Sequence, residues 1–390
     1  MPVLDSIAAR LDEMIAWRRH LHAHPELAFE EVATAGFVAD RLAAFGIEVH
    51  RGLAGTGVVG VLRHGNSPRS VGLRADMDAL AMTERNGFAH ASRHPGKMHG
   101  CGHDGHTAML LGAARHLAET RNFDGTVHLI FQPAEEGAGG AKVMIDQGLF
   151  DRFPCDTVFG MHNWPQLPPG TFGVRAGPVM AAADHFEITV TGKGGHGAMP
   201  QLGIDPVLVA AHIVTAAQSL VSRGTDPVDA AVVSVTMIQG GSAFNVIPDT
   251  VTLSGTVRSF RPETQDRLQH GLARIAERVA AAFGATAETA YRRNYPATLN
   301  SRTEAAVAAS VAAQVVGAQN VHRDLEPSMA AEDFAFMLEQ RPGCYVWLGQ
   351  GGGAASCMLH NPHYDFQDQI LPVGASYWVL LAETALPRGT

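Results

Sequence analysis

The sequence predicts an α/β protein in which a main domain with a mostly parallel sheet is interrupted by a smaller, inserted domain. The chain has 390 residues, more than the roughly 250–300 at which a single core stops growing, so two domains are expected. From residue 1 to about 182, helical patterns alternate with short apolar runs rich in β-branched residues. This alternation is typical of a parallel sheet covered by helices.

The first region contains the patterns that build the main domain. Strands are predicted at the runs GVVGVLR from Gly57, SVGLRAD from Ser70, GTVHLIFQ from Gly125 and DTVFGMH from Asp156. Helices are predicted over residues 5–21, 30–45, 105–121 and 138–148. After the inserted region the same pattern resumes, with a helix at 303–316, the buried strand CYVWLGQ and a closing helix near 373–385.

The region between these parts has a different order of elements. The runs DHFEITVTG, DAAVVSVTMIQGG, DTVTLSGTVRSF and ATAETAYRR predict strands, and residues 205–223 and 262–283 predict helices. The resulting order, βαββαβ, is that of a ferredoxin-like unit. We therefore expect a discontinuous main domain of residues 1–183 and 294–390, with an inserted domain of residues 184–293.

Composition narrows the class of protein. Hydrophobic residues make up 46% of the chain and charged residues 17%, which is ordinary for a packed globular protein. The formal charge of −9 disfavours a nucleic-acid partner. No apolar run has membrane-spanning length, the N-terminal segment lacks the apolar core of a signal peptide, and the four cysteines form no CxxC pair. We expect a soluble, cytoplasmic protein without a membrane partner.

Ionisable side chains follow several of the predicted strands. In open α/β sheets, ligands collect beyond the carboxyl ends of the strands, so side chains there converge although they lie far apart in sequence. Each residue also has an ordinary structural explanation: a packed or surface histidine, a buried cysteine, a solvated glutamate pair or a turn cap. Taken together they favour a metal centre built from Asp76, Asp78, Cys101, His103, Glu135, Glu136, His162 and His360.

The spacing and the kinds of ligand restrict the type of metal centre. The motif Cys101-x-His103 is too tight for a zinc finger. Sulfur, nitrogen and oxygen ligands from separate segments suit a catalytic site, and their number favours two ions that share a carboxylate. Zinc, manganese, cobalt and nickel are all compatible with this mixture of ligands.

Glu135 and Glu136 are expected to divide two tasks. Neighbouring side chains of an extended segment point apart, so one can bind metal while the other takes a proton from water. Delivery of that proton to a leaving amine would complete the hydrolysis of an amide. Asp104 is a candidate cap for a helix beginning near Gly105, and His99 and His106 are candidate orienting groups. An apolar stripe can pin this turn to the sheet through Leu110, Ala113, Ala114 and Leu117.

Several motifs together resemble a known family. They are RRHLHAHPELAFEE, LRADMDAL, MHGCGHDGHTAMLLGAA, FQPAEEGAGGA, GMHNWP, GKGGHGAMP, FNVIPD, GTVRSF, AAEDFAF and LHNPHYDF, in order from residue 18 to about 366. The sequence resembles the dinuclear metallo-aminoacylase and carboxypeptidase family, in the amidohydrolase branch that includes hippurate hydrolases and auxin–amino-acid conjugate hydrolases.

The resemblance implies roles for individual residues. Glu135 would be the general base and acid, and Asp78 would orient a ligand. His196 would donate a hydrogen bond to the developing oxyanion, commonly from the partner subunit, and Asn245 and Arg258 would bind the free carboxylate of the substrate. The alternatives are a loop histidine without a role at 196 and a surface strand residue at 258. The implied metal ligands are Cys101, His103, Glu136, His162 and His360.

We therefore expect an enzyme that hydrolyses the amide bond of hippurate-like or N-acetyl amino acids with two divalent metal ions. The inserted domain would serve as a lid and would form a homodimer or a higher homo-oligomer. A dipeptidase, a carboxypeptidase or an acyl-diamino-acid deacetylase with the same centre is the alternative. A metal-binding protein without turnover is disfavoured, because such a protein has no use for the proton carrier Glu135.

Overall fold

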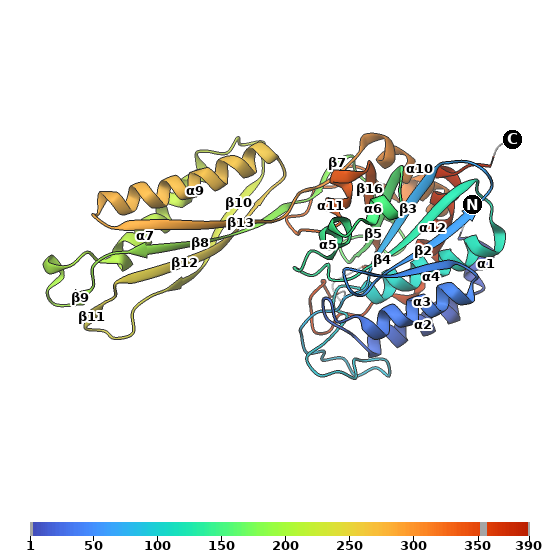
Figure 1. Ribbon diagram of the computed structural model, residues 1–390, viewed down its shortest axis with the longest axis horizontal. Helices are drawn as coiled ribbons and strands as arrows, with labels where there is room; N and C mark the ends of the chain where they lie inside the picture. Colours follow the sequence, from blue (N-terminus) through green and yellow to red (C-terminus); the bar gives the residue numbers. More distant parts are fainter. Residues whose placement is uncertain (1–2, 352–356, 389–390) are drawn as a thin grey trace. The chain divides into compact units, whose positions relative to one another are not determined.

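A computed structural model describes residues 3–351 and 357–388, which belong to two compact units (Figure 1). The main unit comprises the chain up to Val179, Leu299–Glu326 and the chain from Asp333 onward; the inserted unit comprises Met180–Thr298 and Pro327–Glu332. These boundaries lie a few residues from those expected at 184 and 293. The short segment 327–332 is an addition that the sequence patterns did not indicate.

The main unit is built on an eight-stranded sheet in the order β1-β2-β4-β3-β5-β16-β6-β15. The four central strands, β4, β3, β5 and β16, are parallel to one another, whereas β1, β2 and β6 join antiparallel neighbours. The predicted mixed α/β fold with a mostly parallel sheet is confirmed. The strands are β1 Glu48–Leu53, β2 Gly57–His64, β3 Ser70–Asp76, β4 Gly125–Gln132, β5 Thr157–Trp164, β6 Phe172–Gly173, β15 Val321–His322 and β16 Gly343–Gly349.

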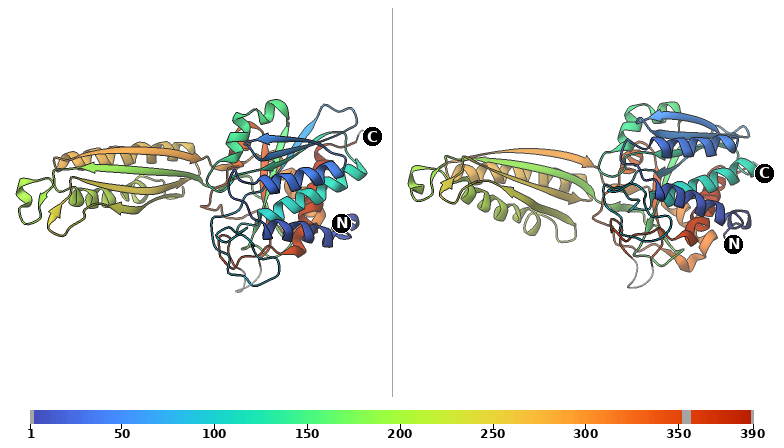
Figure 2. Two further views of the ribbon diagram at one scale, coloured as in Figure 1. Left: turned by 60° about the horizontal axis from the view of Figure 1, so that its bottom comes forward. Right: turned by 90° about the horizontal axis from the view of Figure 1, so that it is seen from below.

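Helices cover both faces of this sheet (Figure 2). The chain passes from β3 through α4 to β4, and then through α5 and α6 past β3 to β5, so it moves across the sheet in opposite directions. Right-handed crossovers therefore place α4 and α5 on opposite faces. The helices are α1 Asp5–Ala8, α2 Leu11–Ala23, α3 Val32–Ala44, α4 His103–Thr120, α5 Gly140–Asp146, α6 Leu149–Arg152, α10 Arg302–Val316, α11 Ala335–Gln340 and α12 Leu371–Ala385.

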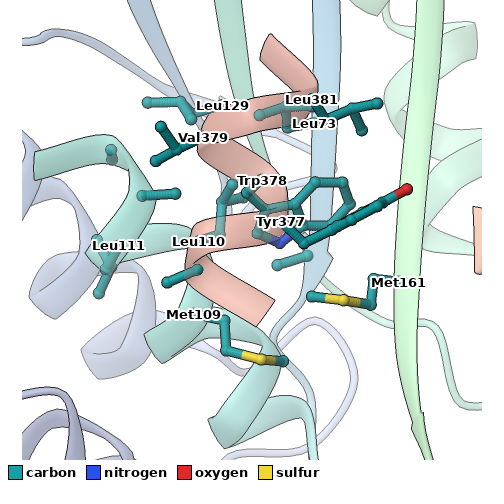
Figure 3. Close-up of a cluster of buried hydrophobic side chains, with 14 of the residues drawn as sticks. Leu73, Met109, Leu110, Leu111, Leu129, Met161, Tyr377, Trp378, Val379 and Leu381 are labelled. Atoms are coloured by element: carbon teal, nitrogen blue, oxygen red, sulfur yellow. The ribbon is translucent and has the colours of Figure 1, made fainter. Parts of the chain in front are cut away.

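The core beneath the α4 face fixes the helix that follows the Cys101–His103 turn. Figure 3 shows Leu110 of α4 and Trp378 of α12 among the side chains that pack over Leu73 of β3. The stripe predicted on α4 is completely buried, since Leu110, Ala113, Ala114 and Leu117 all have 0% exposure. Burial of a large aliphatic side chain contributes about 1.5–3 kcal/mol, so this packing anchors α4 and the turn before it.

The inserted unit has ferredoxin-like topology. Its elements are β8 Ala182–Thr191, α7 Pro206–Ala217, α8 Ser219–Ser222, β10 Ala231–Gln239, β12 Thr250–Ser259, α9 Pro262–Ala282 and β13 Thr286–Tyr295. The sheet order is β10-β12-β8-β13, and every neighbouring pair is antiparallel. The apolar faces of α7 and α9 pack on this sheet in a core of their own. At one end, β9 Gly195–His196 and β11 Val246–Ile247 form a small separate sheet (Figure 1).

Two short strands lie where the chain passes between the units. β7 Gly177–Met180 and β14 Thr298–Asn300 pair as a two-stranded sheet, so the beginning and the end of the insertion run side by side. The sequence patterns missed these strands and also β1, β6, β15 and α11, which are short or lie at edges. The helix predicted over residues 5–21 is in fact two helices, α1 and α2. Within the described ranges, no helix is long and apolar enough to span a membrane.

Candidate metal centre

Strand ends bring the chemistry-bearing segments together, as the α/β pattern predicts. In the parallel pair β3–β4, Asp76 lies opposite Gln132, so the segments that carry Asp78 and Glu135 leave the sheet at the same edge. His162 lies near the end of β5, opposite Trp347 of β16. The centre is therefore formed at the carboxyl edge of the four parallel strands.

The predicted ligands gather in overlapping clusters at this edge. Within each cluster, one ligand atom from each residue lies within 4.8 Å of the others. Cys101 is common to two clusters that together contain all five predicted ligands, Cys101–His103–His162 and Cys101–Glu136–His360. A third cluster joins His103 to Glu135 and Glu136. Individual contacts are short: Cys101 Sγ lies 3.4 Å from His162 Nε2, and Glu136 Oε1 lies 3.1 Å from His360 Nε2.

The turn that carries Cys101 and His103 requires glycine. Gly102 has φ +96°, and a Cβ at this position would lie 2.2 Å from Asn163 Oδ1. Helix α4 then begins at His103, two residues earlier than predicted. Asp104 therefore lies inside the first helical turn and is not a cap, which corrects the prediction. Its carboxylate is buried and accepts a hydrogen bond from His22 Nδ1 at 2.8 Å.

Two of the histidines are oriented by backbone carbonyls. His103 Nδ1 lies 2.8 Å from the carbonyl oxygen of Asp78, and His162 Nδ1 lies 2.7 Å from that of Asn163. A carbonyl only accepts, so each Nδ1 carries a proton and each Nε2 is the ring nitrogen that can bind a metal ion. His103 Nε2 is buried and has no hydrogen-bond partner among the residues described here. A ring nitrogen held in this way inside the cluster is available to a metal ion, which would displace any proton on it.

The electrostatics of the cluster also fit a bound cation. Burial raises the pKa of the Cys101 thiol well above its ordinary value, and the carboxylates of Glu136 and Glu135 raise it further. For His103, burial lowers the pKa, but Asp76 and Asp78 outweigh it and raise the pKa to about 10. Negative groups thus accumulate around Cys101 and His103. A divalent ion with sulfur, nitrogen and oxygen ligands would compensate this charge and hold the thiol as thiolate.

The Glu135–Glu136 turn is held through its backbone. Ala134 has φ +58°, an unusual conformation for a residue with a side chain, and its N–H donates to Glu31 at 2.9 Å. On the other side of Glu135, the N–H of Glu136 donates to Asp78 Oδ2 at 2.9 Å. Asp78 therefore contacts both His103 and the glutamate turn.

His360 reaches the cluster from the C-terminal segment. Its backbone also has a positive φ, +62°, and its N–H donates to the carbonyl oxygen of Gly100 at 2.8 Å. Left-handed conformations of residues other than glycine cost free energy and concentrate at functional sites. The hydrogen bond to Gly100 ties the segment of His360 directly to the turn of Cys101 and His103. His363, by contrast, belongs to none of the clusters found among the described residues.

His99 and His106 differ in their surroundings. His106 Nδ1 lies 2.6 Å from Asp76 Oδ1, and His106 Nε2 lies 2.7 Å from Asn163 Oδ1. His106 thus connects the end of β3 to the end of β5. The ring nitrogens of His99 are buried without hydrogen-bond partners among the described residues, so His99 makes no such connection.

The remaining predicted site residues belong to the inserted unit and do not all lie together. His196 pairs with Val246, and the N–H of Gly197 donates to the carbonyl oxygen of Asn245 at 2.8 Å, so His196 and Asn245 are neighbours. His196 Nδ1 accepts the N–H of Ala198 at 3.0 Å, which leaves Nε2 as the protonated nitrogen.

Arg258 lies on the four-stranded sheet of the inserted unit, at the end away from these residues. It pairs with Ala183 near the start of β8, whereas the small sheet of His196 lies beyond the opposite ends of β8 and β12. Ten residues of strand β12 span about 30 Å. Asn245 and Arg258 of a single inserted unit therefore cannot both contact one substrate carboxylate. The two residues could bind the same carboxylate only if they came from different subunits.

Sequence reasoning gave no individual role to several residues that hold the centre. Arg18 and His22, four residues apart on α2, both contact Asp104. Glu31 binds the backbone of Ala134, and Asn163 contacts both His106 and Tyr364. The sequence does contain one indication of these roles. The segment RRHLHAHPE crowds ionisable residues onto and just after a helix that also has apolar positions expected to be buried.

The fold and the cluster define a mixed α/β protein with a site for divalent metal ions. The chain belongs to Peptidase family M20/M25/M40, whose profile matches residues 72–384. It is 42% identical over 365 residues to the hippurate hydrolase of Campylobacter jejuni, with 94% of each chain covered. It is 40% identical over 375 residues to N-acetylcysteine deacetylase of Bacillus subtilis, with 96% of this chain and 97% of the relative covered.

A solved structure supports the same assignment. A dinuclear metal binding peptidase of the M20 family from Bacillus subtilis has a TM-score of 0.85 and 37% identity to this chain. The alignment covers 97% of this chain and 99% of that one. The predicted family, the predicted fold class and the prediction of a metal-dependent hydrolase acting on amide bonds are confirmed.

Proposed function

We propose that the protein hydrolyses the amide bond of N-acyl amino acids to a carboxylic acid and a free amino acid. The observation that carries the proposal is the convergence of the five predicted ligands at one strand edge, with Glu135 next to the ligand Glu136. Similarity to the hippurate hydrolase of C. jejuni and to the N-acetylcysteine deacetylase of B. subtilis supports the substrate class.

Two divalent ions, of zinc, manganese, cobalt or nickel, would be held by Cys101, His103, Glu136, His162 and His360. His103 Nε2, which has no hydrogen-bond partner among the described residues, and the carbonyl-oriented ring of His162 are available to such ions. When bound, the ions supply Lewis-acid polarisation of the scissile carbonyl. The two-metal relative from B. subtilis and the sharing of Cys101 between two clusters support a pair of ions over one.

Glu135 is the proposed proton carrier. Its carboxylate takes a proton from the attacking water as the new carbon–oxygen bond forms, and gives the proton to the amine as the carbon–nitrogen bond breaks. The backbone clamps at Ala134 and Glu136 hold this carboxylate in place on both sides. A protein that only bound metal would have no need of such a held carboxylate.

The inserted unit supplies the proposed contacts to the substrate. Arg258 binds the free carboxylate, for which the guanidinium fork is suited, and His196 donates to the oxyanion from Nε2. Because His196 and Asn245 lie at the opposite end of the sheet from Arg258, we assign the two groups to different subunits of a homodimer. His196 and Asn245 would then enter the site of the partner. We also propose a cytoplasmic location, in keeping with four cysteines that are all free.

The experiment that tests this function measures amine release from N-acetyl, N-benzoyl and longer N-acyl amino acids. Dipeptides and an acyl-diamino acid are assayed as alternative substrates. Chelator-stripped protein is compared with protein given manganese, zinc, cobalt or nickel. We expect turnover that returns with metal, requires a free α-carboxylate and falls 10²–10⁴-fold in Glu135→Gln. Activity that survives complete stripping would contradict the metal centre, and preference for dipeptides would favour the peptidase alternative.

A further inference from the structure

Arg18 of α2 is completely buried and faces three carboxylates. Its Nη1 lies 2.6 Å from Asp365 Oδ1 and 3.5 Å from Asp104 Oδ2. Its Nε and Nη2 lie 2.9 and 2.8 Å from Asp368 Oδ1. Its Nη2 also lies 3.2 Å from the ring of His90. Each of the three nitrogens of the guanidinium thus has at least one carboxylate partner.

These carboxylates belong to the two segments that carry the proposed ligands His103 and His360. Asp104 directly follows His103, and Asp365 and Asp368 follow His360 in the C-terminal segment. The two segments also touch through the hydrogen bond from the N–H of His360 to Gly100. Arg18 therefore forms a second connection between them, supported from the rigid helix α2 rather than from a loop.

The charges make this connection hard to replace. Asp104 is wholly buried, and Asp368 is mostly buried and also binds Arg19 through its other oxygen. Without Arg18, the carboxylates of the two segments would repel each other, and Asp104 would keep His22 as its remaining cationic partner. Loss of one partner of a buried ion pair is strongly destabilising because the other charge stays buried. Lysine keeps the charge but lacks the fork that spans separate carboxylates.

We propose that Arg18 is a positioning residue that sets the spacing between the Cys101–His103 turn and the His360 segment, and thereby the metal affinity of the centre. This inference rests on the proposed metal ligands. Arg18 touches none of them; it acts through Asp104, Asp365 and Asp368. Residues that support metal ligands from outside the coordination sphere change metal affinity by about 10–100-fold when they are replaced.

The test uses the full chain, stripped with chelator and titrated with Co²⁺ in competition with a chromophoric chelator. The variants are Arg18→Lys, Arg18→Met and, as a matched control, Arg19→Met, which removes a half-exposed arginine of the same helix. Circular dichroism and thermal melting of the metal-free proteins establish that each variant is folded. The Co²⁺ absorption spectrum and the affinity of each equivalent are then compared with those of the wild type.

We expect Arg18→Lys to bind at least one equivalent of Co²⁺ about tenfold more weakly, with an altered absorption spectrum, and Arg19→Met to bind as the wild type does. A role confined to folding would lower the melting temperature of Arg18→Lys and leave its Co²⁺ affinity and spectrum unchanged, which would overturn the inference. If Arg18→Met does not fold, Arg18→Lys decides the question. If the wild type itself binds no Co²⁺, the proposed metal centre is wrong, and the inference falls with it.

Discussion

Glu31 accepts the backbone N–H of Ala134 at 2.9 Å, although the two residues lie 103 positions apart in the sequence. The other oxygen of the same carboxylate accepts the hydroxyl of Thr56 at 2.6 Å, and the side chain of Glu31 is fully buried. Ala134 precedes Glu135 and has a left-handed backbone. A buried carboxylate from the start of α3 therefore holds the unfavourable conformation from which the proposed proton carrier projects.

Replacement of Glu31 tests this relationship. We expect Glu31→Ala to lose about 1–3 kcal/mol of stability, since the N–H of Ala134 is left buried and unpaired. We expect kcat to fall on the order of tenfold with KM nearly unchanged, because the proton carrier is displaced while substrate contacts remain. Glu31→Gln keeps an acceptor for Ala134 and should retain most of kcat. Steady-state kinetics and chemical denaturation measure both effects. An unchanged kcat in Glu31→Ala would show that the hydrogen bond between Glu31 and Ala134 does not position Glu135.

Cys101 and Cys155 offer a matched pair for testing the metal centre. Both are buried, but Cys155 lies just before β5, at the opposite edge of the sheet from the cluster. Metal present at a hundred times its dissociation constant stabilises a protein by about 2.7 kcal/mol. We expect added metal to raise the melting temperature of the wild type and of Cys155→Ala, and to have little effect on Cys101→Ala. Equal stabilisation of both variants would exclude Cys101 as a ligand.

The contacts of His22 predict a dependence of stability on pH. Burial lowers the pKa of His22, but Asp104 and Glu84 outweigh both burial and Arg18 and raise it to about 9. A pKa raised above the unfolded value of 6.5 gives stability that is complete below pH 6.5 and is lost as pH rises through about 9. The shift corresponds to roughly 3 kcal/mol. Denaturation of metal-free wild type and His22→Gln at pH 6 and pH 9.5 should show the difference shrinking at the higher pH.

Subunit mixing tests the assignment of His196 and Arg258 to different subunits. We expect His196→Ala and Arg258→Ala to be nearly inactive alone, because each removes one half of every site. In a mixed dimer, one site would combine the intact Arg258 of one chain with the intact His196 of the other. Co-refolding equal amounts should therefore restore about a quarter of the wild-type activity, since half of the dimers are mixed and half of their sites are intact. No recovery would place both residues in one subunit.

The sequence was sufficient for the elements that have strong periodicity. The apolar runs from Gly57, Ser70 and Gly125 became central or near-central strands, and residues 262–283 became the long helix α9. The βαββαβ order predicted the ferredoxin-like topology, which the sheet order β10-β12-β8-β13 confirms. The short strands β6 and β15 were missed, because a two-residue strand cannot show an alternation of apolar and polar residues.

The site was only partly predictable, for a physical reason. Acids and imidazoles at strand ends can be read from the chain, since parallel strands must end at a common edge. The contacts of Arg18 and Glu31 depend on how α2 and α3 pack, and no local pattern specifies their distant carboxylate or amide partners. The separation of Arg258 from Asn245 follows from the length of strand β12, most of which lies between them, and the sequence does predict that strand.

The pairing of β7 with β14 makes the insertion removable. The first two of the four crossing points of the chain are neighbours, and each unit has its own core. A tight turn from residue 179 to residue 299 would therefore close the gap and leave only the short segment 327–332 of the inserted unit. The shortened protein would keep all five proposed ligands and Glu135, and would lose His196, Asn245 and Arg258. With the proposed roles, metal loading and substrate recognition would be encoded in separable parts of the gene, and the recognition module could be exchanged between relatives without rebuilding the chemistry.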